Sequence, residues 1–296
     1  MTPRYRKGSS PALQESGLKT MRRLHLFEFG DQPWFPQLLR EAETAYLATS
    51  LRFLPLFARR WAERISTVLD PGKPAEILDL CSGSGGAMPS IIDELEKRGY
   101  DARATLTDLY PNPKSASHPR IAWLAEPVDA TQISMKLAGV RTMFSAFHHF
   151  RPHSAKAILK DAFDRRRAIC IFESGPGTLV GVGLMVLVPG NVLAMMPFAR
   201  PFRWAYLVFT YLIPLIPLII FWDGIVSNLR IYSPEQMKRM TEDLQAADYA
   251  WEIGRIRLPV IPGGLPYLIG RPILGATLTI NPEVGLGPGR ESSSPG

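Results

Sequence analysis

From Ala75 onward, short apolar runs alternate with amphipathic helical stretches, and this alternation constrains the fold more than any other feature of the chain. Runs of strand length that alternate with helices are typical of a parallel sheet whose strands are connected through helices. The pattern therefore predicts an α/β fold. Strands are expected at residues 76–80, 104–107, 121–124, 142–146 and 168–172. Helices are expected at residues 87–98 and 153–166.

Both flanks of this region also contain predicted elements. Upstream, apolar residues recur at helical spacing between Trp34 and Val68, which predicts one or two amphipathic helices. These helices are expected either to cap a substrate pocket or to cover one edge of the sheet. Downstream, Ser233-Pro234-Glu235-Gln236 has the N-cap, proline and capping-box residues of a helix start. Two more strands are expected, at residues 251–258 and 273–280.

The two ends of the chain have the composition of disordered tails. Residues 1–24 and 282–296 are rich in Ser, Gly, Pro and charge without periodicity. The formal charge is +7, and much of the excess lies in the first tail, which contains no apolar signal-peptide core. Cys81 and Cys170 lie in apolar runs, which indicates buried thiols, a reducing compartment and no disulfide.

A glycine-rich turn follows the first strand of the sheet. The segment from Ile77 to Gly86, ILDLCSGSGG, is an apolar strand that runs into this turn and then into a helix. A ligand can approach such a turn closely, because glycines lack Cβ and the helix start presents free N–H groups. Asp108 follows the second strand, where a Rossmann-like sheet meets ribose hydroxyls, and Asp129 follows the third strand. These three elements in this order predict a site for a nucleoside-containing cofactor.

Together with residues 144–150 after the fourth strand, FSAFHHF, these segments resemble motifs I to IV of class I S-adenosylmethionine-dependent methyltransferases. The resemblance covers residues 75–172. It implies a seven-stranded Rossmann-like methyltransferase sheet with helices on both faces, and S-adenosyl-L-methionine as cofactor. It places Asp79 near the methionine amino group, Asp108 on the ribose hydroxyls and Asp129 near the adenine. The implied cofactor-contacting residues are Asp79, Cys81, Gly83, Ser84, Gly85, Asp108, Leu109, Asp129, Ala130 and Ser145. Cys81 departs from the family pattern, which has the first glycine of the turn at this position.

Other ligands fit the turn less well. A dinucleotide-binding oxidoreductase would have G-x-G-x-x-G spacing, and its phosphates would bind poorly beside Asp79. A Walker-type phosphate loop would continue into Gly-Lys-Ser/Thr, which is absent from the sequence here. A structural turn in another kind of α/β protein stays an alternative.

His148, His149 and Glu173 are the candidate catalytic residues. The histidines follow the fourth strand, and a neutral imidazole there is a possible general base for an acceptor hydroxyl or amine. The alternative is that the pair caps a helix or packs near the cofactor. Glu173 ends the fifth strand, where it either orients a substrate or ends the strand in solvent. No metal is expected, because Pro152 separates His149 from His153 and prevents one helix from presenting both.

An apolar insertion follows the fifth strand. Residues 174–199 carry no charge, residues 204–222 carry none either, and both runs reach the length of a membrane span. Arg200 and Arg203 lie between them, and prolines interrupt both. The expected form is a helical hairpin that dips into a bilayer from one side; two spans, or a soluble lid over an apolar pocket, are the alternatives.

These observations predict a methyltransferase that acts on a small lipophilic acceptor, such as a lipid or a quinone-like ring, at the cytoplasmic side of a membrane. An RNA or protein methyltransferase and a non-catalytic membrane adaptor are the alternatives. No nucleic-acid partner is expected, because no RNA-binding module is recognisable. The sequence indicates no oligomeric state. The predicted organisation is a tail (1–24), a helical cap (25–72), a cofactor-binding core (73–173), the insertion (174–222), the completion of the core (223–281) and a tail (282–296).

Overall fold

One mixed sheet of seven strands organises the chain. The computed structural model describes residues 23–83, 85–111, 118–259 and 261–273. The strand order is β3-β2-β1-β4-β5-β7-β6. The first five strands pair in parallel, and β7 pairs antiparallel with both β5 and β6, which confirms the predicted seven-stranded Rossmann-like sheet. The strands are β1(Ala75–Asp79), β2(Ala102–Leu106), β3(Ile121–Trp123), β4(Val140–Phe144), β5(Ile169–Phe172), β6(Tyr249–Leu258) and β7(Ile261–Pro272).

The strand order reverses between β1 and β4. From β1 the chain continues to β2 and β3 on one side, whereas β4 and β5 follow on the other side. In open α/β sheets, ligands bind outside the carboxyl ends of the strands at this switch point, because the two connections diverge and leave a crevice. The topology therefore places the expected site at the ends of β1 and β4.

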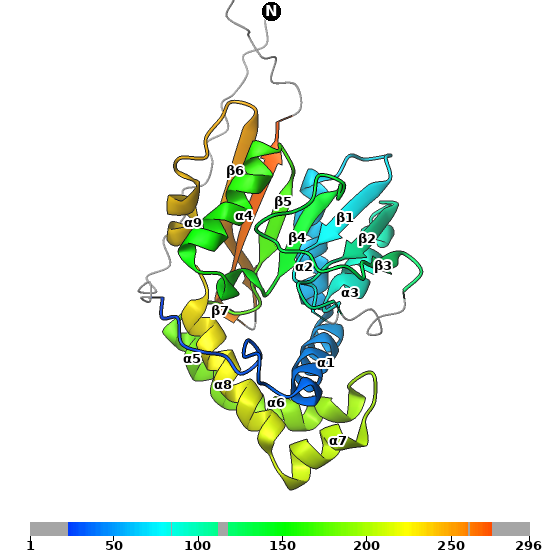
Figure 1. Cartoon of the computed structure of the whole chain (residues 1–296), viewed down its shortest axis with the longest axis vertical. Helices are drawn as coiled ribbons and strands as arrows, with labels where there is room; N and C mark the ends of the chain where they lie inside the picture. Colours follow the sequence, from blue (N-terminus) through cyan, green and yellow to red (C-terminus); the bar gives the residue numbers. More distant parts are fainter. Residues whose placement is uncertain (1–22, 84, 112–117, 260, 274–296) are drawn as a thin grey trace, which may run out of the picture.

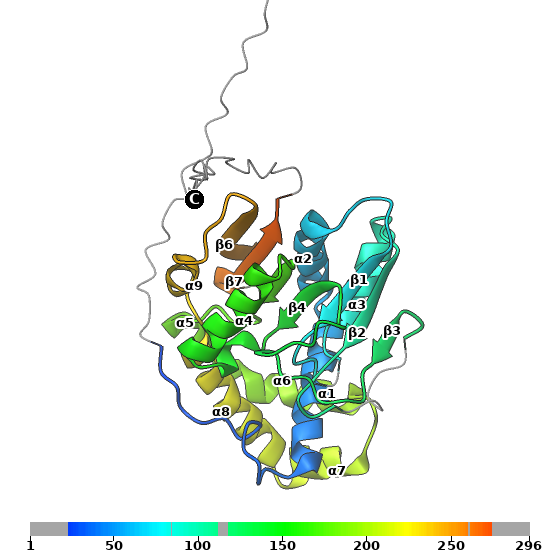
Figure 2. The same cartoon turned by 45° about the horizontal axis from the view of Figure 1, so that its top comes forward.

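Helices cover both faces of the sheet (Figures 1 and 2). One face packs against α2(Pro55–Ile65) and α3(Met88–Lys97), and the other against α4(Pro152–Asp164) and α9(Pro234–Thr241). Trp61 of α2 is fully buried, with its ring 5.2 Å from that of Phe144 and 6.0 Å from that of Phe172. The helix α9 begins with the predicted capping box of Ser233 and Gln236.

Two strand predictions need correction. The last strand is β7(Ile261–Pro272), not residues 273–280, and residues 274–280 lie outside the described part of the chain. Gly263 and Gly264 have positive φ angles inside the β6–β7 hairpin, where Leu258 pairs with Ile261. The strand β4 ends at Phe144 rather than at residue 146, because Ser145 has a φ of 51°, which an extended strand cannot contain.

The helical cap lies at the carboxyl edge of the sheet (Figure 1). It combines α1(Gln37–Phe53) with the insertion, whose helices pack against α1 around Ala42, Tyr46, Met196, Tyr206 and Ile220. The insertion consists of α5(Leu179–Leu184), η3(Met185–Leu187), α6(Val188–Met195), η4(Met196–Phe198), α7(Trp204–Leu207), η5(Val208–Leu212) and α8(Leu215–Arg230). The α1 helix thus belongs to the cap, whereas α2 covers a face of the sheet.

The insertion is not a simple hairpin of two straight helices. Residues Leu179–Phe198 form one helical stretch that is long and apolar enough to cross a membrane. The second run is bent by 80° between Trp204–Leu212 and Leu215–Arg230, where Pro214 interrupts the helix. The helix α8 continues through residue 222 to Arg230, so the expected change to a new segment at 223 falls inside one helix.

An extended segment, residues 24–32, connects the N-terminal end to the cap and is called the strap below. Its Leu24 N–H donates to Leu229 O of α8, and Arg230 of α8 donates back to Leu26 O. The preceding Arg23 donates to the carbonyl oxygens of His148 and Phe150. Arg23 and Leu24 are therefore part of the fold and not of the predicted disordered tail.

Candidate cofactor and acceptor site

The glycine-rich turn after β1 uses left-handed backbone conformations. Cys81, Gly83 and Gly85 have φ angles of 56°, 55° and 92°. Glycine adopts such angles readily, whereas a residue with a Cβ adopts them at a cost. The position of Cys81 therefore has the conformation that explains a glycine in the family pattern, and the cysteine keeps the same turn. Ser84 lies outside the described residues.

Asp79 ends β1 and is almost completely buried behind this turn. Its Oδ1 accepts a hydrogen bond of 2.7 Å from the Thr142 hydroxyl, and its Oδ2 accepts one of 2.7 Å from the Ser82 hydroxyl. Burial raises the pKa of Asp79 to about 7, although these two hydrogen bonds oppose the shift. The carboxylate is thus held in place by neutral donors only.

Asp108 and Asp129 lie close to the same turn. The Gly83 N–H donates to Asp108 Oδ2 at 2.8 Å, and the Val128 N–H donates to the Asp108 carbonyl at 2.9 Å. The second bond brings the segment that follows β3 to the end of β2. Asp129 is exposed and accepts from Thr131, whereas the adjacent Ala130 is buried and Leu109 is half exposed. The three predicted motif segments therefore converge on one edge of the sheet.

The charges at this edge are uncompensated within the described chain. None of the ion pairs between described residues involves Asp79, Asp108 or Asp129. Burial raises the pKa of the Cys81 thiol far above its usual range, and the negative charges of Asp108, Asp79 and Asp129 raise it further. Three carboxylates that act on one thiol make the turn a site for a ligand with positive charge, and a poor one for a phosphate.

Ser145 lies at the end of β4, directly across the switch point from the turn after β1. Ser145 has a φ of 51°. Like Cys81, it is a non-glycine residue that follows the end of its strand in a left-handed conformation, and the two strands are neighbours. Its N–H donates to Phe172 O at 2.8 Å, which fixes the backbone as it leaves the sheet. Sparsely populated backbone conformations concentrate at functional sites, so this pair agrees with the position that the topology indicates.

His148 and Glu173 form a buried pair at the ends of β4 and β5. The His148 ring lies in η2(Phe147–His149), with Nδ1 2.8 Å from Glu173 Oε2, while the His148 N–H donates to Glu173 Oε1 at 3.0 Å. Glu173 is 0% exposed, so the alternative that it ends the strand in solvent is wrong. A carboxylate only accepts, so Nδ1 carries the proton and Nε2 is left as the unprotonated nitrogen.

The strap supplies acidic residues to the histidine pair. Glu28 lies with its oxygens 4.0 Å from His148 Nε2 and 3.6 Å from His149 Nδ1, and Asp31 Oδ1 is 2.9 Å from the same His149 nitrogen. Burial lowers the pKa of His149, but Asp31 and Glu28 outweigh it and raise the pKa overall. Arg230 of α8 pairs with both carboxylates, at 3.1 Å from Glu28 and 2.6 Å from Asp31.

The sequence did not predict these three residues. Glu28 and Asp31 lie in FEFGD, a segment without periodicity, and only their charge among aromatic neighbours distinguished them. Arg230 lies at the polar end of α8, and its pairs with the strap fix the base of the insertion.

A second acidic pair joins α1 to α8. Burial and the adjacent Asp223 raise the pKa of Glu43 to about 9, and the two carboxyl groups share a hydrogen bond. The carboxylate of Asp223 also accepts from the N–H groups of Phe29 and Gly30, at 2.8 Å and 3.0 Å. The neutral Glu43 carboxyl therefore donates to Asp223, and the pair holds the strap against the cap.

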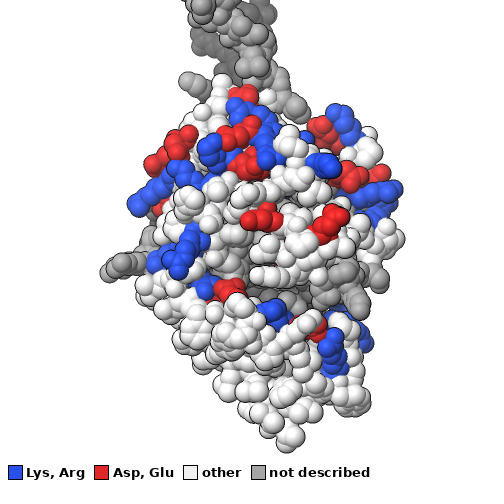
Figure 3. Space-filling view, in the orientation of Figure 1, with Lys and Arg blue, Asp and Glu red and all other residues white. Residues whose placement is uncertain are grey.

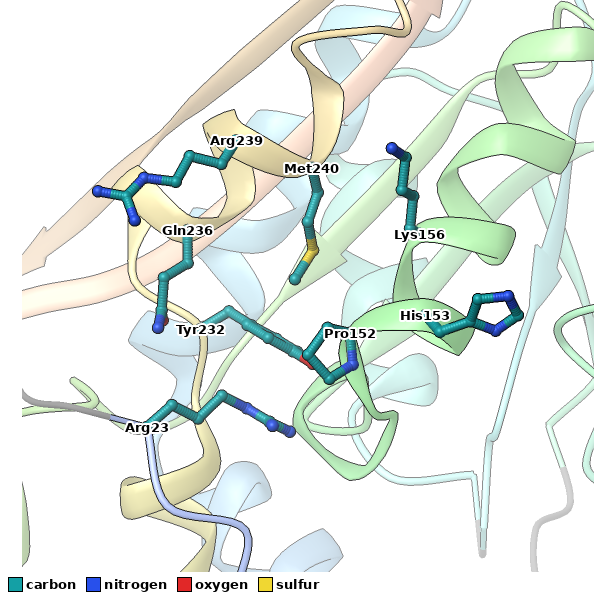
Figure 4. A pocket seen from close by; sticks show the side chains of 8 residues that line it. All are labelled: Arg23, Pro152, His153, Lys156, Tyr232, Gln236, Arg239 and Met240. Carbon is teal, nitrogen blue, oxygen red and sulfur yellow. The ribbon is translucent and has the colours of Figure 1, made fainter.

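A basic pocket of about 490 Å³ lies elsewhere, between α4 and α9 (Figure 4). Two of its cations have partners: Lys156 pairs with Asp243, and Arg23 stacks on Tyr232 at 4.1 Å while it donates to backbone carbonyls. None of the predicted site residues lines this pocket. It is distinct from the site at the switch point.

The sheet order, the turn after β1 and the acidic residues after β2 and β3 together define a Rossmann-like fold of the class I methyltransferase type. No family model matches the chain, and no curated protein matches it. Among solved structures, it is similar to the plantazolicin methyltransferase BpumL in complex with SAH, with a TM-score of 0.46, 10% identity, 80% of this chain covered and 98% of that chain.

Two further similar structures are larger proteins. The mitomycin 7-O-methyltransferase MmcR gives a TM-score of 0.40 and 13% identity, with 73% of this chain and 54% of that chain covered. Human N-acetylserotonin methyltransferase in complex with SAM gives a TM-score of 0.39 and 10% identity, with 72% of this chain and 51% of that chain covered. This chain thus spans about half the length of these two. At such identities and TM-scores, none of the three bears on the activity of this chain.

Proposed function

We propose that the protein is an S-adenosyl-L-methionine-dependent methyltransferase. The observation that carries the proposal is the group of three carboxylates, Asp79, Asp108 and Asp129, which surrounds a glycine turn at the switch point without a compensating cation among the described residues. S-adenosylmethionine carries a sulfonium and an ammonium group, so its charge complements this site, whereas a dinucleotide would bring phosphates to it.

Each carboxylate has a position suited to one part of this cofactor. Buried Asp79, held by Thr142 and Ser82, fits the ammonium group; Asp108 fits the ribose hydroxyls. Exposed Asp129 next to buried Ala130 fits the adenine edge. When bound, the cofactor supplies an activated methyl group, and the protein has mainly to align the acceptor with it.

A base for the acceptor proton is available on the other side of the switch point. The Glu173 carboxylate occupies Nδ1 of His148, so Nε2 is the nitrogen that remains to accept a proton. His149 differs, because Asp31 contacts its Nδ1 and favours the protonated form. Of the two candidate bases, His148 is therefore the one proposed for this role.

Calorimetric titration tests the cofactor. S-adenosylmethionine and S-adenosylhomocysteine are titrated into the detergent-solubilised full chain and into two variants. Binding is expected for the wild type and for Asp101→Ala, whose exposed carboxylate lies at the opposite edge of the sheet before β2, and lost in Asp108→Ala. A folded wild-type protein that binds neither compound rejects the methyltransferase and leaves a membrane adaptor of the same fold.

We further propose that the cap inserts its apolar tip into one leaflet and that the acceptor is a small lipophilic molecule. The end of the molecule farthest from the sheet carries few charged side chains on the face seen in Figure 3. The insertion exposes large apolar side chains along its length: Leu179, Val186, Leu187, Phe198, Trp204, Leu212 and Leu218. Exposed apolar surface of this kind favours contact with a membrane or an apolar partner over contact with water. The exposed Arg200 and Arg203 at its border favour anionic headgroups.

The packing of the insertion supports a shallow insertion into one leaflet over two complete spans. The helix α8 is fixed to the body, because Asp223 and Arg230 bond the strap and Ile216 and Ile220 pack in the cap. The 80° bend before α8 is incompatible with one straight span. At the tip, the side chains of Trp204 and Leu212 are exposed, and we place them in the lipid.

Flotation with vesicles tests this placement. The double variant Trp204→Glu/Leu212→Glu changes side chains that are 75% and 77% exposed, so it leaves packing intact. Its binding to phosphatidylglycerol-containing vesicles is expected to fall at least about tenfold, since two buried charges each cost more than a kilocalorie per mole in a bilayer. The matched control is Met135→Glu, which is 72% exposed on the sheet domain and should bind like the wild type. Equal binding of all three proteins rejects the tip as the membrane contact.

A further inference from the structure

Two imidazole nitrogens and a carboxylate converge under the strap without satisfying one another. One ligand atom each of Glu28, His148 and His149 lies within 4.8 Å of the other two. The Nε2 of His148 is buried and has no hydrogen-bond partner, whereas the Nδ1 of His149 lies 2.9 Å from Asp31 Oδ1. Buried polar atoms are almost always hydrogen-bonded, so the orphaned Nε2 of His148, which faces the Glu28 carboxylate, indicates a missing ligand.

The surroundings prepare His148 to bind a metal ion. Its Nδ1 is held at 2.8 Å by Glu173 Oε2, which itself is completely buried. Histidines that bind metals characteristically donate their second nitrogen to a carboxylate, which fixes the tautomer and aims the free lone pair. Here that lone pair is on Nε2 and points toward Glu28 and His149.

Glu28 also has one oxygen available. Its Oε1 accepts from the Ser227 hydroxyl at 3.1 Å and pairs with Arg230 at the same distance. Its Oε2 lies 3.6 Å from His149 Nδ1. Oε1 is therefore held by α8 at 4.0 Å from His148 Nε2, while Oε2 faces His149.

The charge balance permits a cation in spite of Arg230. The carboxylates of Glu28, Asp31 and Glu173 contact the two imidazoles, whereas Arg230 contacts Glu28 and Asp31 from the side of α8. Arg23 reaches the carbonyl of His148. A bound ion would displace the proton of His149, because metal-binding imidazoles are neutral. Three carboxylates against two guanidinium groups then leave net negative charge around the ion.

We propose that Glu28, His148 and His149 bind a divalent first-row transition ion, of which Zn²⁺ is the best match. Two imidazole nitrogens and one carboxylate oxygen suit Zn²⁺ and its neighbours, whereas Mg²⁺ prefers oxygen ligands. Asp31, which contacts His149, lies next to this set. The bonds from Zn²⁺ to its ligand atoms are about 2.0 to 2.2 Å long. The three side chains would therefore have to move closer together than they lie here.

Such an ion would fasten the strap to the ends of β4 and β5. Glu28 comes from the strap and the histidines come from η2, so the ion joins segments that are 120 residues apart in the chain. It would also occupy the only nitrogen of His148 that is left for proton transfer. His148 can therefore act as a base only in the metal-free protein, and the metal site stands independently of the cofactor.

The test uses untagged full-length protein in detergent, stripped with a chelator, dialysed and titrated with Zn²⁺ or Co²⁺ alone. The expected result is one equivalent of bound metal, visible absorption of the Co²⁺ form, and an increased melting temperature. Glu28→Gln and His149→Ala should lose the equivalent, and Glu173→Gln should weaken binding about 10- to 100-fold. The control His153→Ala removes an exposed histidine of α4 and should bind as the wild type does.

Three outcomes overturn the proposal. They are the absence of a stoichiometric ion in folded wild-type protein, unchanged binding in Glu28→Gln, and loss of binding in His153→Ala. If Glu28→Gln fails to fold, the Co²⁺ spectrum of the wild type decides, because imidazole and carboxylate ligation gives d–d bands that weak surface binding does not. None of these readouts depends on binding of S-adenosylmethionine.

Discussion

The acidic residues on the two sides of the switch point have different kinds of partner. At the ends of β1 and β2, Asp79 and Asp108 accept hydrogen bonds only from hydroxyl groups and backbone N–H groups. At the ends of β4 and β5, Glu173 contacts His148, and Glu28 contacts both a histidine and Arg230. Among the described residues, the first side lacks the positive charge that the second side contains.

This difference separates a site that needs a ligand from a network that holds the protein together. A buried carboxylate with neutral partners is costly until a cation arrives, so Asp79 is maintained at a cost in stability. The network on the other side connects the strap, η2 and α8. These three segments are far apart in the sequence and do not belong to one common helix or sheet. Removing one of its members should affect folding, whereas changes in the turn should mainly affect binding.

The largest effect is expected from Arg230→Ala. Arg230 is 3% exposed, and its loss leaves Glu28 and Asp31 without their guanidinium partner and Leu26 O without a donor. Removing one partner of a buried pair costs about 3 to 5 kcal/mol, measured as the free energy of unfolding in denaturant. Arg203→Ala, which breaks a partly exposed pair with Glu41, should cost less than about 1 kcal/mol. Equal losses in the two variants would show that the network has no special role.

Glu43 should make stability depend on pH. Its pKa of about 9 in the folded protein exceeds the ordinary carboxyl value, so the folded state holds a proton that the unfolded chain releases. Stability is therefore expected to decrease as the pH rises from the ordinary carboxyl range to about 9, with a limiting slope of about 1.4 kcal/mol per pH unit. Glu43→Gln keeps the donor to Asp223 and removes the titration. The free energy of unfolding, measured by denaturation at several pH values, should fall more steeply with pH in the wild type than in Glu43→Gln. Equal pH dependence of the two proteins would contradict the shared proton.

Asp79 should make cofactor affinity depend on pH in the opposite direction. Its folded pKa of about 7 means that acid protonates the carboxylate that the cationic ligand needs. The affinity for S-adenosylmethionine should fall about tenfold between pH 7 and about pH 5.5, since each pKa unit corresponds to about 1.4 kcal/mol. In Asp79→Asn, binding should be weaker and independent of pH over this range. Calorimetry decides, and an unchanged pH profile in the variant would assign the dependence to another group.

The smallest effect is expected at Cys81. Replacing Cys81 by glycine relieves a φ of 56° and removes a small side chain, so the free energy of unfolding should change by less than about 1 kcal/mol and cofactor affinity should be retained. Cys81→Val places a β-branched side chain at the same angle and should destabilise the turn by about 1 to 3 kcal/mol. Thermal unfolding of the two variants compares them. A stable valine variant would show that the turn adapts freely.

Local patterns predicted most of the sheet and the first half of the site. The spacing of apolar runs located β1, β2, β3 and β5 within two residues, and the glycine turn with Asp108 and Asp129 indicated the elements that converge. The turn could be recognised because its signal is local: a strand, glycines and a helix in one segment. The strand β7 was placed incorrectly because its pairing with β6 in a hairpin, and not its local pattern, keeps Gly263 and Gly264 within the strand.

The second half of the site could not be predicted from local patterns. Glu28 approaches His148 only because the strap crosses the ends of β4 and β5, a contact between residues that are 120 positions apart. The same limit applies to the proton shared by Glu43 and Asp223, which lie on α1 and α8. Such contacts depend on how the cap packs on the sheet, and the sequence around each residue carries no sign of its partner.

The most direct test of the uncompensated acidic turn compares a cationic and a phosphate-containing ligand. S-adenosylmethionine and NAD⁺ are each titrated by calorimetry into the full-length protein at neutral pH. The account predicts saturable one-to-one binding of S-adenosylmethionine and no measurable binding of NAD⁺, because Asp79 and Asp108 attract the first ligand and repel the pyrophosphate of the second. Binding of NAD⁺ without binding of S-adenosylmethionine would contradict it and would make the protein a dinucleotide-binding enzyme.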